Sequence, residues 1–199
     1  MVRSIVLLFT RDLRVHDNPM LAAGCALADQ VVPLFVVDPA ITAPPSRRRF
    51  LAESLADLRE SLRRLGGDLL VRKGDPADVA AKVAAEAGTK QVALAADVSA
   101  HAKAREKRLR ERGLEVRAFP GVTVVPAGTV RPSTGGDRYK VFTPYWRAWE
   151  AAPWRDPSEA PARVVLPDGF TGDDPRAVLG ATAISPLMTG GEQAAQDRL

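Results

Sequence analysis

Short apolar runs alternate with longer amphipathic segments along the first 120 residues of the chain. Each apolar run is bounded by charged residues, glycine or proline, which is typical of buried strands. The pattern predicts strands over 2–9, 31–37, 68–71, 91–95 and 115–119. The run Val31–Val37 is almost wholly apolar. This composition indicates a strand that is covered on both faces.

Helices are predicted between the strands. The clearest has leucines at 51, 55, 58, 62 and 65, and these steps of four and three residues form one apolar stripe. We expect it to follow an N-cap at Ser46 and to end before Gly66-Gly67. Further helices are predicted over 19–28, 76–87, 100–112 and 144–151. The alternation predicts an α/β fold, with a Rossmann-like five-stranded parallel sheet, helices on both faces and an extended linker after it.

The amino-acid composition of the chain changes after residue 150. Residues 153–186 hold six prolines and few periodic apolar positions, so a linker lying on a surface is predicted over 151–190. Residues 191–199 are similar to the first turns of a new helix. The predicted organisation is therefore one α/β domain over 1–150, a linker, and the start of a truncated further domain.

The composition indicates the compartment of the protein and its relation to membranes. The single cysteine, Cys25, cannot form an internal disulfide, which favours a reducing cytoplasm, and it is expected to be a small core residue. No run of 18 apolar residues and no secretory signal is visible, so we expect a cytoplasmic monomer with no membrane span. Residues 1–150 hold 24 Lys and Arg against 17 Asp and Glu, a modest +7. Phosphate attraction is thus possible, but a solvated surface is the simpler interpretation.

One acidic residue follows each of the first four predicted strands: Asp12, Asp38, Asp75 and Asp97. In open parallel sheets, ligands bind outside the carboxyl ends of the strands. Asp75 is better explained as a helix cap, and Asp12 is expected to pair with a flanking arginine, Arg11 or Arg14. This leaves Asp38 and Asp97 as the candidate ligand contacts.

Several motifs of common chemistry are missing from the sequence. The first strand is not followed by a Gly-x-Gly-x-x-Gly run, and no Gly-x-x-x-x-Gly-Lys-Ser/Thr loop is present. Two histidines and one cysteine make no metal-binding pattern, and no serine stands in a nucleophile elbow. We therefore predict no catalytic residue and no metal site in this chain.

Three ordered segments carry a resemblance. They are Arg11-Asp12-Leu13-Arg14 with Asp17-Asn18-Pro19, then Phe35-Val36-Val37-Asp38-Pro39, then Asp137–Trp146 with its Tyr-Lys-Val-Phe-Thr-Pro-Tyr run. Together they resemble the DNA photolyase and cryptochrome family. The similarity is to the amino-terminal, antenna-binding α/β domain of a cyclobutane pyrimidine dimer photolyase.

The resemblance implies a site and cofactors. In such proteins the amino-terminal domain holds a light-harvesting chromophore, while a helical carboxy-terminal domain holds FAD and acts on UV-damaged DNA. Matching this chain to deazaflavin-binding relatives places the chromophore contacts at Phe35, Val36, Val37, Asp38, Arg47 and Asp97. Folate-binding relatives carry an Asn-Glu pair where this chain has Ala96-Asp97. This difference favours an 8-hydroxy-5-deazaflavin antenna over methenyltetrahydrofolate. A site that holds no chromophore is a further alternative.

Two other functions remain as alternatives. One is a cryptochrome-type blue-light receptor without repair activity. The other is a free-standing nucleotide-binding module, which is disfavoured because no glycine-rich loop is present to cradle phosphate. Because the resemblance covers only the α/β part of the family's architecture, we expect that residues 1–199 do not split pyrimidine dimers by themselves.

Overall fold

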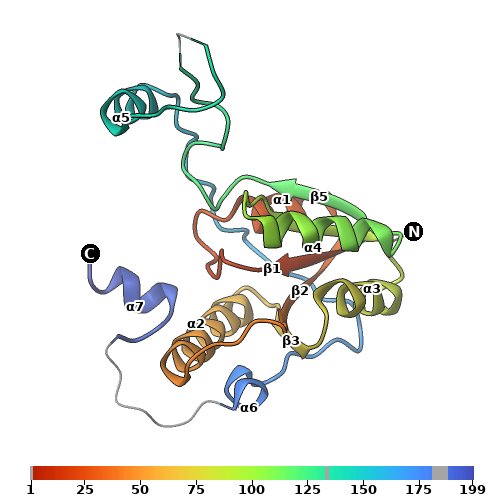
Figure 1. Cartoon of the computed structure of the whole chain (residues 1–199). Coiled ribbons are helices and arrows are strands. Elements are labelled where there is room, and N and C mark those ends of the chain that lie inside the picture. The colour runs from red at the N-terminus through yellow and green to blue at the C-terminus, as the bar shows by residue number, and fades with distance from the viewer. Residues whose placement is uncertain (1, 133–134, 181–187) are drawn as a thin grey trace.

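Five parallel strands form the centre of the computed structural model, which describes residues 2–132, 135–180 and 188–199 (Figure 1). The strands are β1 (Ser4–Phe9), β2 (Gln30–Val37), β3 (Leu70–Lys73), β4 (Gln91–Ala95) and β5 (Glu115–Phe119). Their spatial order is β3-β2-β1-β4-β5, and all neighbours are parallel. The predicted five-stranded parallel sheet is confirmed, although β3 begins two residues later than the sequence pattern indicates.

Four helices connect the strands: α1 (Pro19–Leu27), α2 (Pro45–Arg64), α3 (Pro76–Glu86) and α4 (Ala100–Glu111). Right-handed crossovers place α1 and α2 on one face of the sheet and α3 and α4 on the other, where these two helices pack against each other. The predicted N-cap at Ser46 is wrong, because α2 already begins at Pro45 after Pro44. The fixed backbone angle of proline suits the first helical position, and no side chain caps this end.

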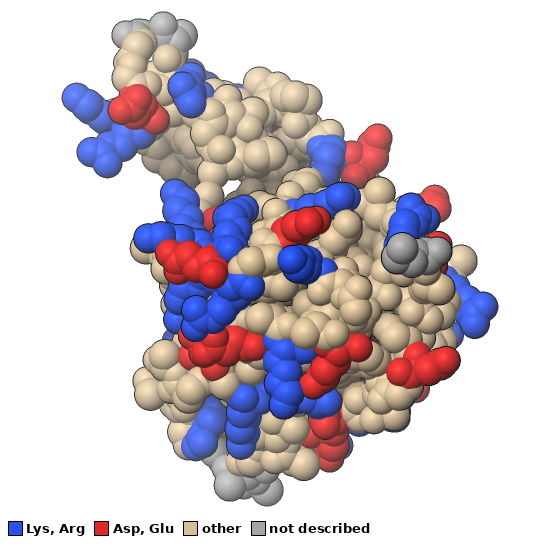
Figure 2. Space-filling model, turned by 90° about the vertical axis from the view of Figure 1, so that its right-hand side faces the viewer, with Lys and Arg blue, Asp and Glu red and all other residues tan. Residues whose placement is uncertain are grey.

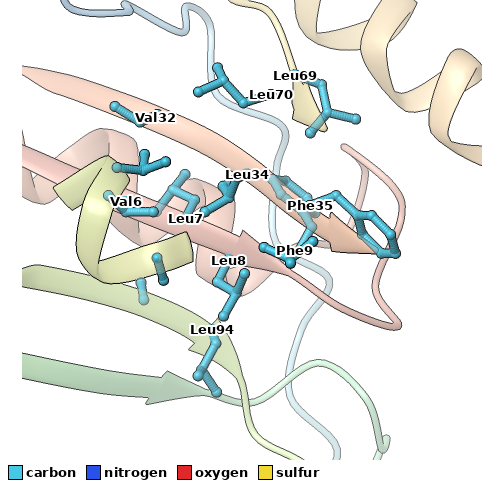
Figure 3. Close-up of a cluster of buried hydrophobic side chains, with 14 of the residues drawn as sticks. Val6, Leu7, Leu8, Phe9, Val32, Leu34, Phe35, Leu69, Leu70 and Leu94 are labelled. Carbon is cyan, nitrogen blue, oxygen red and sulfur yellow. The ribbon is translucent and has the colours of Figure 1, made fainter. Parts of the chain in front are cut away.

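The core is built around β1, whose residues 5–9 are each no more than 1% exposed. Phe9 lies opposite Phe35 of β2, and Leu8 lies opposite Leu34 on one side and Leu94 of β4 on the other (Figure 3). On α2, the predicted leucine stripe is confirmed, since Leu55, Leu58 and Leu62 are buried. A central strand surrounded in this way holds the sheet edge, and the loops that leave it, in fixed positions.

The segment after residue 150 also contributes to this core. Val164 is fully buried, and its N–H donates to the carbonyl oxygen of Leu65 at 2.7 Å. A Cβ on Gly67 would lie 2.5 Å from Val164 Cγ1, so the glycine at the end of α2 makes room for this packing. The prediction of a purely surface-lying segment is therefore wrong at Val164. A short helix, α6 (Pro175–Leu179), also follows in this region.

The later helices lie at the edges of the molecule. Helix α5 (Phe142–Glu150) stands away from the sheet and has no buried residue among those described (Figure 1). Phe142 is 74% exposed, and Tyr145 and Trp146 are also exposed. Helix α7 (Glu192–Gln196) lies beside α2, where the N–H of Glu192 donates to Asp57 Oδ2 at 2.7 Å. Of the helices described, none is long and apolar enough to cross a membrane.

Asp68 precedes β3 and connects helix α2 to the later segment around Gly172. Arg59 Nε donates to Asp68 Oδ1 at 2.7 Å, and the N–H of Gly172 donates to Oδ2 at 3.0 Å. Burial raises the pKa of the Asp68 carboxyl, but hydrogen bonds from Arg59, Leu69 and Gly172 outweigh burial and hold the pKa below its ordinary value of 3.8. The charged carboxylate therefore stabilises the folded chain.

Replacing Asp68 with asparagine is expected to lower the free energy of unfolding at pH 7 by about 1–3 kcal/mol, because a half-buried, charge-assisted network is broken. Since the folded pKa is depressed, the contribution is present above pH 3.8 and is lost as the pH falls through the folded value. Urea unfolding at pH 7 and pH 3 would measure the difference. Asp29→Asn, which affects an exposed pair with Arg3, is the control and should change little. Equal losses at both pH values would contradict the prediction.

The Cys25 thiol is expected to react slowly. Cys25 packs against the core, and burial raises the pKa of its thiol to about 11. Because the thiolate is the reactive form, its reaction with a disulfide reagent at pH 7.5 should be roughly 100-fold slower than that of free cysteine. Stopped-flow absorbance in buffer and in guanidinium chloride would measure both rates. A native rate equal to the denatured rate would show that the thiol is accessible.

Candidate functional site

A cleft of about 210 Å³ opens at the carboxyl ends of β1, β2 and β4. The chain leaves β1 toward α1 on one face and leaves β4 toward α4 on the other face. The two loops therefore part at this point, which is where open α/β sheets bind ligands. The apolar wall consists of Leu8, Phe9, Phe35, Val36, Ile41 and Pro76. The polar groups are Thr10, Arg11, Asp38, Asp97, His101 and Arg105, together with Ser99.

A second cavity of about 310 Å³ adjoins the cleft on the side of α2. The two share four residues: Phe35, Val36, Asp38 and Ile41. Val37, Arg48 and Leu179 line the second cavity only. The combined space is large enough for a flat ligand, since small-molecule sites measure upward of about 300 Å³.

Asp97 is a nearly buried acceptor at the end of β4. Its side chain is 5% exposed. The N–H of Ser99 donates to Oδ1 at 2.9 Å, and Arg11 Nη1 donates to Oδ2 at 3.2 Å. The hydrogen bond from Ser99, followed by that from Arg11, holds the pKa of Asp97 below its ordinary value despite burial. Asp97 is therefore charged at neutral pH and is held in one orientation in the cleft.

Asp38 is the matching acceptor at the end of β2. Its side chain is 8% exposed, and its Oδ1 accepts the N–H of Ala40 at 2.9 Å. His101 Nε2, on α4, lies 4.0 Å from Asp38 Oδ2 across the cleft. Two acidic side chains, from the loops on either side of the β1 end, thus face one apolar slot. Such an arrangement can accept hydrogen bonds from a ring-bound N–H or hydroxyl group.

The other two acidic residues have structural roles. Asp75 is confirmed as the cap of α3, since its Oδ1 accepts the N–H groups of Ala77 and Asp78 at 2.8 and 3.2 Å. The prediction for Asp12 is wrong: it is 2% exposed and forms no ion pair with either flanking arginine. Arg11 instead pairs with Asp97, and Arg14 donates to the carbonyl oxygens of Asp17 and Gly121. Burial raises the pKa of the Asp12 carboxyl.

The loop between β1 and α1 is anchored where it enters α1. Asn18 caps α1, with its Oδ1 accepting the N–H of Leu21 at 3.0 Å. Asp17 adopts a positive φ of 45° and binds both terminal nitrogens of Arg155, at 2.5 and 2.8 Å. These contacts hold the loop that carries Thr10 and Arg11 against the edge of the cleft.

The structure brings together five of the six predicted site residues. Phe35, Val36, Val37, Asp38 and Asp97 line the cleft or the adjoining cavity. Arg47 does not, because it is exposed on the first turn of α2, where the next residue, Arg48, lines the second cavity instead.

Sequence reasoning missed the contribution of α4 to the cleft. His101 and Arg105 stand four residues apart, and this spacing places them on one face of a helix. That spacing was the available signal, but the strongly basic composition of α4 concealed it. Within the parts of the chain that the structure describes, no three His, Cys, Asp or Glu side chains are grouped so that they could hold a metal ion.

On the face drawn in Figure 2, charge does not single out a binding area. On the face drawn in Figure 2, basic and acidic side chains are interspersed over the body. The cleft, with its apolar wall and two acidic side chains, is the candidate functional site.

A cleft at the switch point of a doubly wound parallel sheet defines a ligand-binding α/β domain. The sequence profile of the DNA photolyase family matches residues 5–163, and the chain belongs to this family. Members of the family bind flavin and an antenna chromophore, and its photolyases act on UV-damaged DNA.

Two curated relatives illustrate the similarity. The deoxyribodipyrimidine photo-lyase of Streptomyces griseus is 44% identical over 95% of this chain and 44% of its own length. The cryptochrome DASH of Natronomonas pharaonis is 36% identical over 83% of this chain and 38% of its own length. The chain thus spans less than half of the length of these relatives.

Solved structures agree on the fold. A class III photolyase from Agrobacterium tumefaciens superposes with a TM-score of 0.87 at 26% identity, and the match covers all of this chain and 44% of that one. An archaeal photolyase from Sulfolobus tokodaii, described with two FAD molecules and a novel light-harvesting cofactor, gives a TM-score of 0.81 at 22% identity. That match covers 98% of this chain and 45% of that one.

Proposed function

We propose that this chain is the light-harvesting, chromophore-binding domain of a deoxyribodipyrimidine photolyase. The observation that carries the proposal is the cleft at the carboxyl ends of β1, β2 and β4, where Asp38 and Asp97 face an apolar wall. An antenna chromophore needs a rigid slot and polar groups that fix its orientation, and it needs no acid, base or nucleophile. Membership of the DNA photolyase family supports the same function.

The residues fit a flat, partly polar ring system. Phe35 and Val36 supply the wall of the slot, and Val37 continues it into the adjoining cavity. The Asp38 and Asp97 carboxylates accept hydrogen bonds from a ring N–H or a hydroxyl group. Arg47 lies on the exposed first turn of α2. It can donate to a carbonyl edge of the ligand only if the ligand extends as far as this turn.

We propose that the chromophore is of the 8-hydroxy-5-deazaflavin type, with methenyltetrahydrofolate as the alternative. Ala96-Asp97 takes the place of the Asn-Glu pair of folate-binding relatives. The almost enclosed Asp97 carboxylate suits a compact ring hydroxyl or N–H group.

The activity of a whole photolyase is proposed only for a longer protein that contains this domain. In such a protein, FAD would lie in a carboxy-terminal domain and electron transfer from it would repair cyclobutane pyrimidine dimers in UV-damaged DNA. For this chain we propose a cytoplasmic monomer, and the single cysteine supports that compartment. The proposed division of the chain is an antenna domain over 1–150, a linker over 151–190 that packs Val164 into the core of this domain, and the start of the flavin domain over 191–199.

An absorbance titration tests the proposed function. The purified 199-residue chain would be mixed with 8-hydroxy-5-deazaflavin and, separately, with methenyltetrahydrofolate. Saturable binding of the deazaflavin with a red-shifted absorbance band is the expected result. Saturable binding of the folate alone would keep the antenna role and overturn the choice of chromophore. If neither binds, the antenna function fails for this chain.

A cryptochrome-type light receptor is the second candidate, and the identity of 36% to a cryptochrome DASH favours it over other classes. Light-driven repair of a dimer-containing oligonucleotide by a longer protein that contains this domain would decide for the photolyase. A free-standing nucleotide-binding module is the third candidate, and ATP-dependent protection of the chain from thermal unfolding would support it.

A further inference from the structure

Arg105 is a buried cation that has no partner in the part of the chain that the structure describes. Only 8% of the residue is exposed, yet Nε and one terminal nitrogen, Nη2, have no hydrogen-bond acceptor among the described residues. No described carboxylate forms an ion pair with it. Burial lowers the pKa of its guanidinium, and the nearby carboxyl groups of Asp97, Glu106 and Asp12 act in the opposite direction. A buried guanidinium with unused N–H groups is costly, so its position calls for an acceptor.

Arg105, whose buried N–H groups lack an acceptor in the described chain, is part of the cleft lining. Arg105 lines the cleft from α4, one turn after His101. Thr10 lines the same cleft from the end of β1, and its buried hydroxyl also has no partner among the residues that the structure describes. The side chains of Thr10 and Arg105 come from opposite sides of the switch point, and both have hydrogen-bonding capacity left for a ligand.

The neighbouring acidic groups do not satisfy Arg105. Asp97 already receives hydrogen bonds from Arg11 and Ser99. Asp12 accepts the N–H of Thr10 at 3.2 Å, while its other oxygen, like the Arg105 nitrogens, is buried without a partner. Neither of these two carboxyl groups therefore accepts the unused N–H groups of Arg105.

Building on the proposed function, we propose that Arg105 and Thr10 bind an ionised oxygen of the ligand, so that the cleft selects ring systems that carry an oxyanion. The oxyanion can be an ionised ring hydroxyl or a phosphate, because a guanidinium donates to either through the same N–H groups. Asp38 and Asp97 would then accept from the N–H or hydroxyl groups of the same ligand. The cleft would thus recognise one ligand by two features: its hydrogen-bond donors, through the two acidic side chains, and its anionic oxygen, through Arg105 and Thr10.

Two matched pairs of probes test the selection. 8-Hydroxy-5-deazariboflavin is compared with 5-deazariboflavin, and FMN is compared with riboflavin. In each pair the ring is shared and only the oxyanion differs. We expect the oxyanion-bearing member of one pair to bind the 199-residue chain about 10- to 100-fold more tightly, as for a charge-assisted hydrogen bond. The pair that shows the preference identifies a ring hydroxyl or a phosphate as the source.

Substitutions at Arg105 test whether this residue causes the preference for the oxyanion-bearing ligand. Arg105→Met is expected to reduce the ratio of the two dissociation constants to about 1, because the hydrophobic part is kept and the donors are lost. Arg105→Lys should restore part of the ratio, since the charge remains without the planar fork. Arg110→Met is the matched control, because Arg110 is exposed on the same helix and pairs with Glu106. It should leave the ratio unchanged.

A measurement that needs no ring separates this inference from the proposed function. The buried Nε–H of Arg105 is followed by nitrogen-proton NMR, assigned by its loss in Arg105→Lys, while inorganic phosphate is added at constant ionic strength. A saturable shift supports an oxyanion site at Arg105 even if no chromophore binds, which would overturn only the antenna function. Ring binding without an oxyanion preference overturns the inference and leaves the antenna function standing.

A purely structural role for Arg105 also gives a distinct result. If Arg105 only balances the buried Asp12, Arg105→Met lowers the unfolding midpoint while the ratio of dissociation constants keeps its wild-type value. The phosphate titration then moves no Arg105 resonance. That combination would overturn the inference.

Discussion

Replacing Asp97 with alanine is expected to weaken the binding of 8-hydroxy-5-deazaflavin by about 10- to 100-fold, because a charged acceptor held in the cleft is lost. The Asp97 side chain is 5% exposed and is oriented by Ser99 and Arg11. Its pKa is held below the ordinary value, so the carboxylate is available as an acceptor throughout the neutral range. Fluorescence or absorbance titration of both proteins would measure the two dissociation constants.

Asp75→Ala is the matched control for this experiment. Asp75 also follows a strand, but it caps α3 and pairs with Arg108 at 2.6 Å, outside the cleft lining. Its removal should lower the free energy of unfolding by about 0.5–2 kcal/mol through the lost cap and leave chromophore binding unchanged. Equal affinity of wild type and Asp97→Ala would show that Asp97 has no part in binding.

Val164→Asp is expected to have the largest effect on stability. Val164 is fully buried in the core cluster, and its backbone is hydrogen-bonded to Leu65. A carboxyl group at this position would be desolvated without a partner, which should lower the free energy of unfolding by about 3–5 kcal/mol. A loss of that size is a large fraction of the roughly 5–15 kcal/mol by which a domain is stable. Thermal and urea unfolding of both proteins would measure it.

Ala162→Asp introduces the same side chain two residues earlier, where the chain is exposed. Its effect should stay within about 0.5 kcal/mol, as for most surface substitutions. If Val164→Asp were as mild as this control, the segment would be a detachable linker rather than part of the core.

The sequence by itself determined the strands, the helices between them and the class of the sheet. These features depend on local patterns: a run such as Val31–Val37 can be buried on both faces, and the leucine stripe of α2 has one helical period. Asp75 was also predictable, since an acidic residue before Pro76 is a local capping pattern. Because parallel sheets bind ligands at the carboxyl ends of their strands, Asp38 and Asp97 could be singled out as well.

Only the tertiary structure decided which side chains share the cleft and which segments share the core. Arg11 could have paired with the adjacent Asp12, but the turn directs it to Asp97, 86 positions away in the sequence. Arg105 belongs to a basic helix, and burial alone distinguishes it from the exposed Arg110. Val164 lies in a proline-rich stretch, yet it is buried because Gly67 leaves space beside it. These outcomes depend on the packing of residues far apart in the chain, and local periodicity contains no information about that packing.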